Sequence, residues 1–204
     1  MTGNLWVADP ADRPATARAW FALDDGREIV FEDPRLLGRI ALLTPSEFQR
    51  WEAAQGMEPL SQAFTAAWLA AQTAASRRQA KVFLLDQSIV CGLGNIWAAE
   101  ALFAAGIHPF TPVNQLRPNE IVALHGAIRA TLARAVESAY ADYVAPGQTL
   151  ESEGYGVAVY GREGQPCGRC QEPVVRRPQA GRSTYFCPRC QPARRRSITL
   201  HVDQ

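Results

Sequence analysis

Two pairs of cysteines near the carboxy-terminal end constrain this chain more than any other sequence feature. Cys167 with Cys170, and Cys187 with Cys190, each form a Cys-x-x-Cys motif, and sixteen residues separate the two pairs. This spacing is typical of zinc ribbons. Each motif turns two thiolates toward one point, so the four thiolates complete a closed tetrahedral site. We predict one structural Zn²⁺ there.

The stretch between the cysteine pairs is predicted to be a short β-hairpin. Residues 173–177 and 179–186 read as two strands around a turn that contains Gly181. Arg182 then lies at or beside the tip of the hairpin. A hairpin of this size buries no core of its own, so the metal should supply most of its folding free energy. Two disulfides, or four unliganded thiols, are the alternative for these cysteines.

Charge is divided unevenly along the chain, although the formal net charge is only +1. Residues 1–60 carry 6 Arg against 10 Asp and Glu, a local net charge of −4. Residues 160–196 carry 9 Arg against Glu163 and Glu172, a local net charge of +7. A polyanion could bind this arginine-rich end. A plain solvated surface is the other interpretation that composition allows.

Helix start and stop signals occupy the middle of the chain. Thr44 to Glu47 form a capping box with Pro45 at the first helical position, which predicts a helix that ends near Gly56. Apolar residues at helical spacing predict further helices over residues 61–80, 81–89, 96–105 and 118–140.

A glycine-containing turn, Cys91 to Asn95, joins two of these predicted helices. Gly92 and Gly94 allow the backbone to approach a phosphate closely, and Asn95 stands where its side chain and the following amides could hold that phosphate at a helix N-terminus. Such a turn is also a common simple connection, so the pattern alone leaves both interpretations open.

The first 43 residues are predicted to form β-structure. Alternating or β-rich runs cover residues 4–8, 19–23, 28–32 and 38–43, and Asp24 to Gly26 is a hairpin turn between two of them. Four short strands make a thin sheet whose apolar face needs a partner, and the sequence offers no further strands to provide one.

Two groups of motifs resemble the formamidopyrimidine-DNA glycosylases. Leu84 to Gln87, Gly92 to Trp97, Glu100 to Phe103 and Gly106 to Pro109 are similar to the helix-two-turn-helix signature of that family. Val159 to Arg162, the four cysteines, and Gly181 to Pro188 are similar to its zinc finger. The similarity is looser at Met1 to Gly3 and Asp33 to Arg35, which resemble parts of the family's amino-terminal β-sandwich.

The resemblance implies an enzyme that flips an oxidised purine out of duplex DNA, cleaves its glycosidic bond and nicks the backbone by elimination. Met1, Arg35 and Leu37 match the wedge that fills the space left by the flipped base. Asn95, Arg182 and Lys81 match positions that hold the phosphates around the lesion, with Arg35 a further DNA contact. Arg182 also matches the proton donor of the second elimination.

The sequence departs from the family at its reactive end. There the family's chemistry begins at an amino-terminal proline, next to a glutamate, whereas this sequence begins at Met1, which aligns with an internal wedge position. Lys81 is the only lysine, so a substitute amine is scarce. We therefore expect the printed chain to bind DNA with little or no base excision.

Several functions remain open at this point. The chain could be an incomplete version of a true glycosylase and lyase, through a start codon assigned too late or through fragmentation, or a non-catalytic paralogue that binds lesions and abasic sites. An endonuclease VIII-type enzyme acting on oxidised pyrimidines is a second alternative. A zinc-ribbon interaction module without a DNA role is a third.

The combined expectation is an α+β chain with four parts. They are a partial β-sandwich (residues 1–43), a helical helix-two-turn-helix domain (44–150), a four-cysteine zinc finger forming a zinc-ribbon β-hairpin (157–191) and a basic tail (192–204). No apolar run approaches the roughly 20 residues that a membrane helix needs. We expect a bacterial cytoplasmic monomer, associated with the nucleoid through double-stranded DNA that contains oxidised bases or abasic sites.

Overall fold

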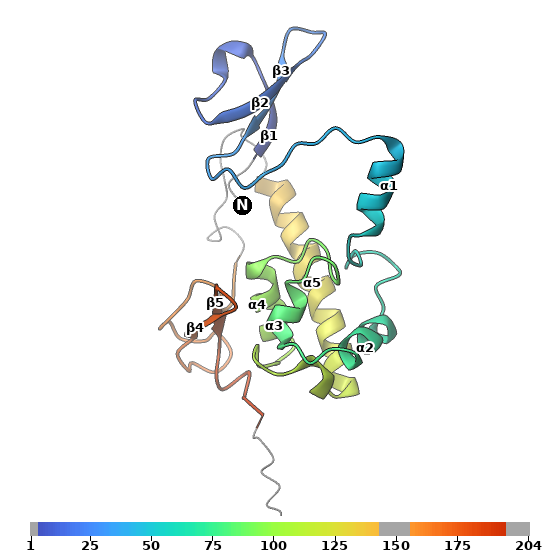
Figure 1. Ribbon diagram of the computed structural model, residues 1–204. Coiled ribbons are helices and arrows are strands. Elements are labelled where there is room, and N and C mark those ends of the chain that lie inside the picture. The colour runs from blue at the N-terminus through green and yellow to red at the C-terminus, as the bar shows by residue number, and fades with distance from the viewer. Residues whose placement is uncertain (1–3, 143–155, 195–204) are drawn as a thin grey trace, which may run out of the picture.

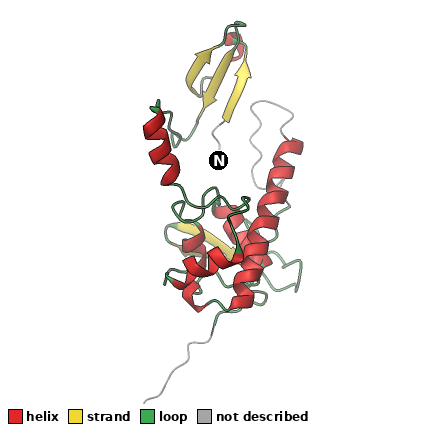
Figure 2. Ribbon diagram, turned by 90° about the vertical axis from the view of Figure 1, so that its right-hand side faces the viewer, coloured by secondary structure: helices red, strands yellow, loops and turns green. Residues whose placement is uncertain are grey.

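The computed structural model describes residues 4–142 and 156–194. In that part of the chain a three-stranded sheet stands at one end, helices α1 to α5 follow, and a two-stranded hairpin lies beside the helices (Figures 1 and 2). The predicted α+β class is confirmed. Within the described ranges, no helix combines the length and the apolar character needed to cross a membrane.

The amino-terminal sheet is antiparallel, with strand order β1-β3-β2. Its strands are β1 (Asn4–Ala8), β2 (Ala17–Ala22) and β3 (Glu28–Glu32), and a short 3₁₀ turn, η1 (Pro10–Asp12), lies between the first two. The predicted turn between β2 and β3 is confirmed, since Gly26 adopts a φ of 83°.

The predicted fourth strand, over residues 38–43, is wrong. This segment has no strand structure, because the chain turns away from the sheet directly after β3. The Asp33 carboxylate accepts the backbone N–H of Gly38 at 2.6 Å, and the Asp33 carbonyl accepts that of Leu36 at 3.3 Å. Leu36 has a φ of 56°, and one residue in the left-handed region is enough to redirect a strand.

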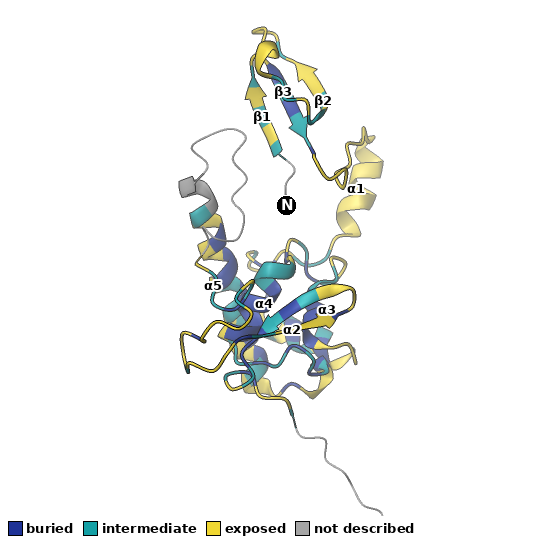
Figure 3. Cartoon of the chain, turned by 90° about the vertical axis from the view of Figure 1, so that its left-hand side faces the viewer, coloured by how far each residue is buried: buried dark blue, intermediate teal, exposed yellow. Residues whose placement is uncertain are grey.

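The two faces of the sheet are buried to different degrees. Val30, at the centre of β3, is fully buried, whereas Trp20 on the same face is 49% exposed, with the Arg13 guanidinium carbon 3.8 Å from its ring centroid. On the opposite face Val7 and Phe21 are 46% and 47% exposed. The structure agrees with the prediction of an apolar face that lacks a covering layer within the described residues (Figure 3).

Helix α1 (Pro45–Ala53) begins as the capping box predicts. The Thr44 hydroxyl accepts the N–H of Glu47, and the Glu47 carboxylate accepts that of Thr44. The prediction of one helix over residues 61–80 is wrong in length, because Thr65 caps a shorter helix, α2 (Ala66–Ala74). Helix α3 (Ala80–Leu84) is also shorter than the predicted range of 81–89.

The main core lies where α4 (Asn95–Ala104) and α5 (Pro118–Asp142) pack together. Both helices follow the predicted ranges within two residues, and Gly106 ends α4 with a φ of 69°. A 3₁₀ turn, η2 (Val113–Gln115), connects them. Leu102, Leu124 and Ile128 are almost completely buried in this core, so the N-terminus of α4 stands on a rigid base.

Candidate nucleic-acid interface

The four cysteines of the predicted metal site converge. Their Sγ atoms all lie within 4.8 Å of one another, with 3.8 Å between those of Cys167 and Cys190 and 3.4 Å between those of Cys170 and Cys187. Tetrahedral Zn–S bonds of 2.3 Å require sulfur atoms about 3.8 Å apart, so the cluster fits this metal. Backbone N–H groups also point at two of the sulfur atoms, as in a zinc knuckle.

The hairpin between the cysteine pairs consists of β4 (Val175–Gln179) and β5 (Arg182–Phe186). Ala180 and Gly181, with φ values of 47° and 74°, form the predicted tight turn. Arg182 is therefore the first residue after the tip, as predicted.

A buried carboxylate fixes the segment that leads into the finger. Glu100, in the middle of α4, is only 5% exposed. Its two oxygens accept the backbone N–H groups of Ala158, Val159 and Tyr160 at 2.7, 2.9 and 2.8 Å. Three donors around one carboxylate offset the cost of burying its charge. The finger is thereby held against α4 in one orientation.

Two buried glutamines fix the other side of the finger. Gln179 donates to the Pro109 carbonyl at 3.1 Å and to the side chain of Gln79 at 2.8 Å. Gln191 donates to the Ile107 carbonyl at 2.8 Å. Both buried glutamines therefore have hydrogen-bond partners on the helical side of the interface between the finger and the helices.

Lys81 lies inside this interface and not on the surface. The residue is 1% exposed, and its Nζ donates to the Ser183 carbonyl at 2.7 Å and to the Thr184 hydroxyl at 2.8 Å. Burial, followed by the positive charge of Arg182, lowers the pKa of Lys81 to about 8. The lysine thus ties α3 to β5 directly beside the hairpin tip.

Asn95 approaches the same carbonyl from the first position of α4. Its Nδ2 lies 3.3 Å from the Ser183 carbonyl and 3.4 Å from the Tyr160 hydroxyl. Its Oδ1 is buried and has no hydrogen-bond partner among the described residues. The preceding turn is held by Gln87, which accepts the N–H of Gly92 at 2.9 Å. The sequence placed Asn95 in the turn, and the structure makes it the first helical residue.

Arg182 completes the group. It is exposed and makes no ion pair with a carboxylate of the described residues, while its charge is close enough to lower the pKa of Lys81. The structure therefore brings three predicted residues, Lys81, Asn95 and Arg182, together around Ser183, with an exposed guanidinium and a helix N-terminus on one side of the finger.

The predicted wedge belongs to a different region. Arg35 and Leu37 lie in the loop after β3, where both are exposed, Leu37 to 62%. The loop is closed by Asp33 and contains the left-handed Leu36, which is itself 68% exposed. Gly38 cannot be replaced without displacing Phe31, because an added Cβ would lie 2.5 Å from its ring. Met1 lies outside the described residues.

Sequence reasoning missed the roles of Glu100, Tyr160 and Gln179. One signal was present: Glu100 is the single charged residue of α4, whose other members are almost all apolar. A lone acid in such a helix needs matched donors when it is buried. For Gln179 and Tyr160 the sequence carries no comparable signal.

Known protein families match both the helical region and the finger. Residues 55–143 match the "Formamidopyrimidine-DNA glycosylase H2TH domain", and residues 164–193 match the "Zinc finger found in FPG and IleRS". The formamidopyrimidine-DNA glycosylase of Chloroflexus aggregans is 43% identical over 203 residues, which cover 94% of this chain and 71% of that protein.

Two solved structures of the Lactococcus lactis formamidopyrimidine-DNA glycosylase are also similar. One is bound non-covalently to DNA containing an AP site, with a TM-score of 0.82 at 29% identity over 94% of this chain and 71% of that one. The other is a complex with Fapy-dG-containing DNA, with a TM-score of 0.82 at 29% identity over 95% and 72%. This chain therefore belongs to the formamidopyrimidine-DNA glycosylase family, whose named members are DNA glycosylases of damaged-base repair.

Proposed function

We propose that this chain binds double-stranded DNA that contains an oxidised purine or an abasic site, as a member of a base-excision-repair family. The observation that carries the proposal is the convergence of Asn95 and Arg182 beside Ser183, at the junction of α4 and the hairpin. Relatives bound to AP-site DNA and to Fapy-dG DNA support the choice of substrate. The bacterial relatives support a cytoplasmic location at the nucleoid.

In this proposal Asn95 and Arg182 hold phosphates of the damaged strand. The bond from Asn95 to the Ser183 carbonyl is long, at 3.3 Å, and that carbonyl already accepts from Lys81 at 2.7 Å. The Nδ2 group of Asn95 can therefore turn to a phosphate at little cost. The Arg182 guanidinium, which has no carboxylate partner within residues 4–142 and 156–194, offers two parallel donors to phosphate oxygens. It is also our candidate for the proton donor of the second elimination.

Lys81 supports the proposed DNA-binding site from its buried position between α3 and β5. In the described arrangement its ammonium positions the Ser183 carbonyl and adds positive charge under the hairpin. A direct phosphate contact by Lys81 remains a prediction. Because its amine is buried and bonded twice, we do not assign it the covalent attack on the sugar.

The exposed loop after β3 is our candidate for the wedge. Leu37 can enter a base stack as aliphatic wedges do elsewhere, and Arg35 can follow it toward the opposite strand. The left-handed Leu36 supports this assignment, because backbone strain persists where function requires a particular display of side chains. Met1 completes the predicted set.

The four-cysteine cluster holds one Zn²⁺ per chain in this proposal, in a purely structural role. Four thiolate ligands leave no open coordination position for a water or a substrate. Metal analysis of the purified protein tests the ratio. One zinc per chain is expected, and a metal-free protein with a folded finger would refute the role.

Substitution of Arg182 tests the DNA-binding face. Arg182→Ala should weaken binding to an abasic duplex about tenfold and lower its salt dependence by about one phosphate contact. Arg189→Ala is the matched control, because this exposed arginine belongs to the same finger but not to the tip. Fluorescence anisotropy at several salt concentrations gives both quantities. Equal behaviour of the two variants would remove Arg182 from the interface.

Borohydride trapping on abasic DNA tests the assignment of Lys81. We expect no covalent adduct on this lysine, because its Nζ is engaged with Ser183 and Thr184. Peptide mapping by mass spectrometry locates any adduct, and DNA attached to Lys81 would contradict the buried arrangement. Duplexes with an oxidised pyrimidine, run beside those with an oxidised purine, distinguish the endonuclease VIII-type alternative.

A further inference from the structure

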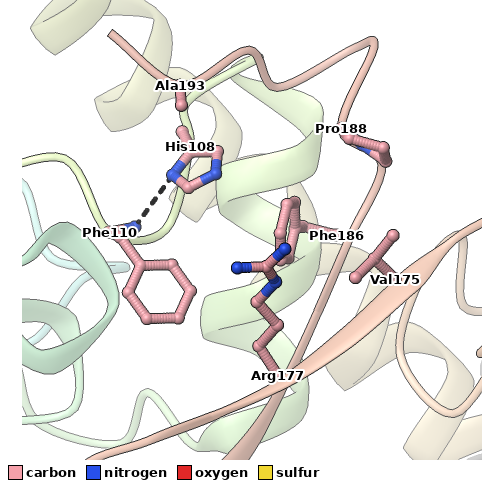
Figure 4. A pocket seen from close by; sticks show the side chains of 7 residues that line it. All are labelled: His108, Phe110, Val175, Arg177, Phe186, Pro188 and Ala193. Carbon is pink, nitrogen blue, oxygen red and sulfur yellow. Dashed lines mark hydrogen bonds between the residues drawn. The ribbon is translucent and has the colours of Figure 1, made fainter. Parts of the chain in front are cut away.

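A second concave site lies on the face of the hairpin that packs toward the helices. The cavity has a volume of about 520 Å³ and is formed by the segment after α4 and the two strands of the finger (Figure 4). Its apolar lining includes Phe110, Val175, Phe186 and Pro188. On the ladder, Val175 pairs with Phe186 at the cysteine end, whereas Arg182 lies at the tip. The apolar lining of the cavity therefore lies toward the cysteine end of the hairpin, and Arg177, which pairs with Thr184, lies between that end and the tip.

Two polar side chains face this apolar lining, and both are hydrogen-bond donors. The Arg177 guanidinium extends over the cavity beside Phe186, and it has no carboxylate partner among the described residues (Figure 4). His108 accepts the N–H of Phe110 at its Nδ1, at 3.3 Å, which leaves a proton on Nε2. Burial, followed by the charge of Arg177, lowers the pKa of His108, which favours the neutral ring.

A second depression of about 200 Å³ adjoins the cavity, since His108 and Ala193 line both. Arg117 and Arg194 line this part, and its one acid, Glu120, is paired with Arg194. We call these two adjoining depressions the groove, and among their described lining residues Arg117, Arg177 and Arg194 outnumber the acid Glu120. An occupant that reaches both depressions must be extended, as a peptide segment is.

We propose that this groove binds an acidic peptide segment of a partner protein, with one carboxylate on Arg177 and a large apolar side chain against Phe110 and Val175. A planar guanidinium pairs with a carboxylate through two parallel bonds. An apolar floor beside it anchors the neighbouring side chain, as at the centre of protein interfaces. The inference goes beyond DNA binding and does not depend on it.

Single-stranded nucleic acid fits this groove less well. Stacking of bases requires open aromatic faces along a line of cations. Phe186 is only 3% exposed, and its ring meets His108 edge-on with centroids 4.8 Å apart. The rings thus form the floor of a cavity and offer no platform for a base.

A labelled peptide tests the proposal on the full zinc-containing chain. The probe is fluorescein-Gly-Ser-Asp-Glu-Asp-Leu-Phe, and the control peptide carries Asn and Gln in place of its acids. We expect saturable binding of the probe, weakened about tenfold by the neutral peptide and at least about tenfold by Arg177→Ala. The probe affinity of Arg177→Lys should lie between those of the original chain and Arg177→Ala, because a lysine ammonium cannot make the two parallel hydrogen bonds of a guanidinium.

The adjacent arginine provides a matched control. Arg176 points to the opposite side of β4, where it bonds Ser183 and lies 3.7 Å from Glu163. Arg176→Ala should change peptide affinity less than about twofold, and zinc content confirms that each variant has a folded finger. Arg177→Ala should leave affinity for abasic duplex within about twofold of the original value.

Several results would overturn the proposal. They are the absence of saturable binding at about 1 mM probe, equal loss in the two arginine variants, and displacement of the probe by oligothymidylate with the same Arg177 dependence. The last result would make the groove a nucleic-acid site. A chain shortened to end at Arg194 should bind the probe unchanged, and a gain above about tenfold would assign the groove to the chain's own last residues.

Discussion

Two regions of the molecule differ in how they bury their side chains. One is the polar interface between the zinc finger and the helices, and the other is the amino-terminal sheet. At the finger, buried charged side chains have hydrogen-bond partners: Glu100 accepts three N–H groups and Lys81 donates to two oxygens. On the sheet, an apolar face that includes Val7 and Phe21 stays about half exposed. A satisfied polar interface fixes one orientation, whereas an uncovered apolar face adds little stability and attracts a partner.

Removal of the metal should have the largest effect on the finger, both on its folding and on the affinity of the chain for DNA. A hairpin this small has no core of its own, so chelation of the metal should unfold it. The polar interface between the finger and the helices should be lost with it. Affinity for abasic duplex should then fall to the non-specific range of about 10⁻⁶ to 10⁻⁴ M. Anisotropy before and after zinc restoration measures the loss. Unchanged binding in protein shown to lack zinc would separate the finger from DNA recognition.

Glu100→Gln should have the next largest effect. The amide places a donor against the backbone N–H groups that the carboxylate now accepts, at a cost of about 2 to 4 kcal/mol in the free energy of unfolding. The control is Glu163→Gln, because the Glu163 side chain is 56% exposed and its loss should cost less than about 0.5 kcal/mol. Chemical denaturation compares them. Equal values would mean that Glu100 does not fix the finger.

Two valines of the sheet should show the smallest difference. Val30→Ala removes fully buried methyl groups and should cost about 2 kcal/mol, whereas Val7→Ala, on the face left open, should cost less than about 1 kcal/mol. Thermal unfolding of both variants tests this. A large cost at Val7 would show that something covers that face in solution.

The sequence predicted the parts of the molecule that depend on local signals. The cysteine spacing, the capping box at Thr44 and the glycine after α4 correctly predicted a metal site and two helix ends. The range 61–80 was too long because apolar spacing alone does not show that Thr65 caps α2 or that the helix ends at Ala74. The strand over residues 38–43 was wrong because the turn at Asp33 and Leu36 follows from a side-chain hydrogen bond that no pattern encodes.

The residues of the site could be predicted from the sequence, but not which of them are buried and which are exposed. Family motifs named Lys81, Asn95 and Arg182 together, yet only the packing of α3 against β5 decides that the lysine is buried and the arginine exposed. Contacts between residues about a hundred positions apart leave no periodic trace. The roles of these residues on DNA, and the division of the chain at residues 43, 150 and 191, remain predictions.

Asn95→Ala tests most directly the claim that the junction of α4 and the finger holds DNA. Its Oδ1 has no partner among the described residues, and its two donor contacts are long. The free energy of unfolding should therefore change by less than about 1 kcal/mol, while affinity for abasic duplex falls about tenfold. Both are measured on one preparation, by denaturation and by anisotropy. Unchanged affinity, or a loss of stability that accounts for the loss of binding, would contradict the account.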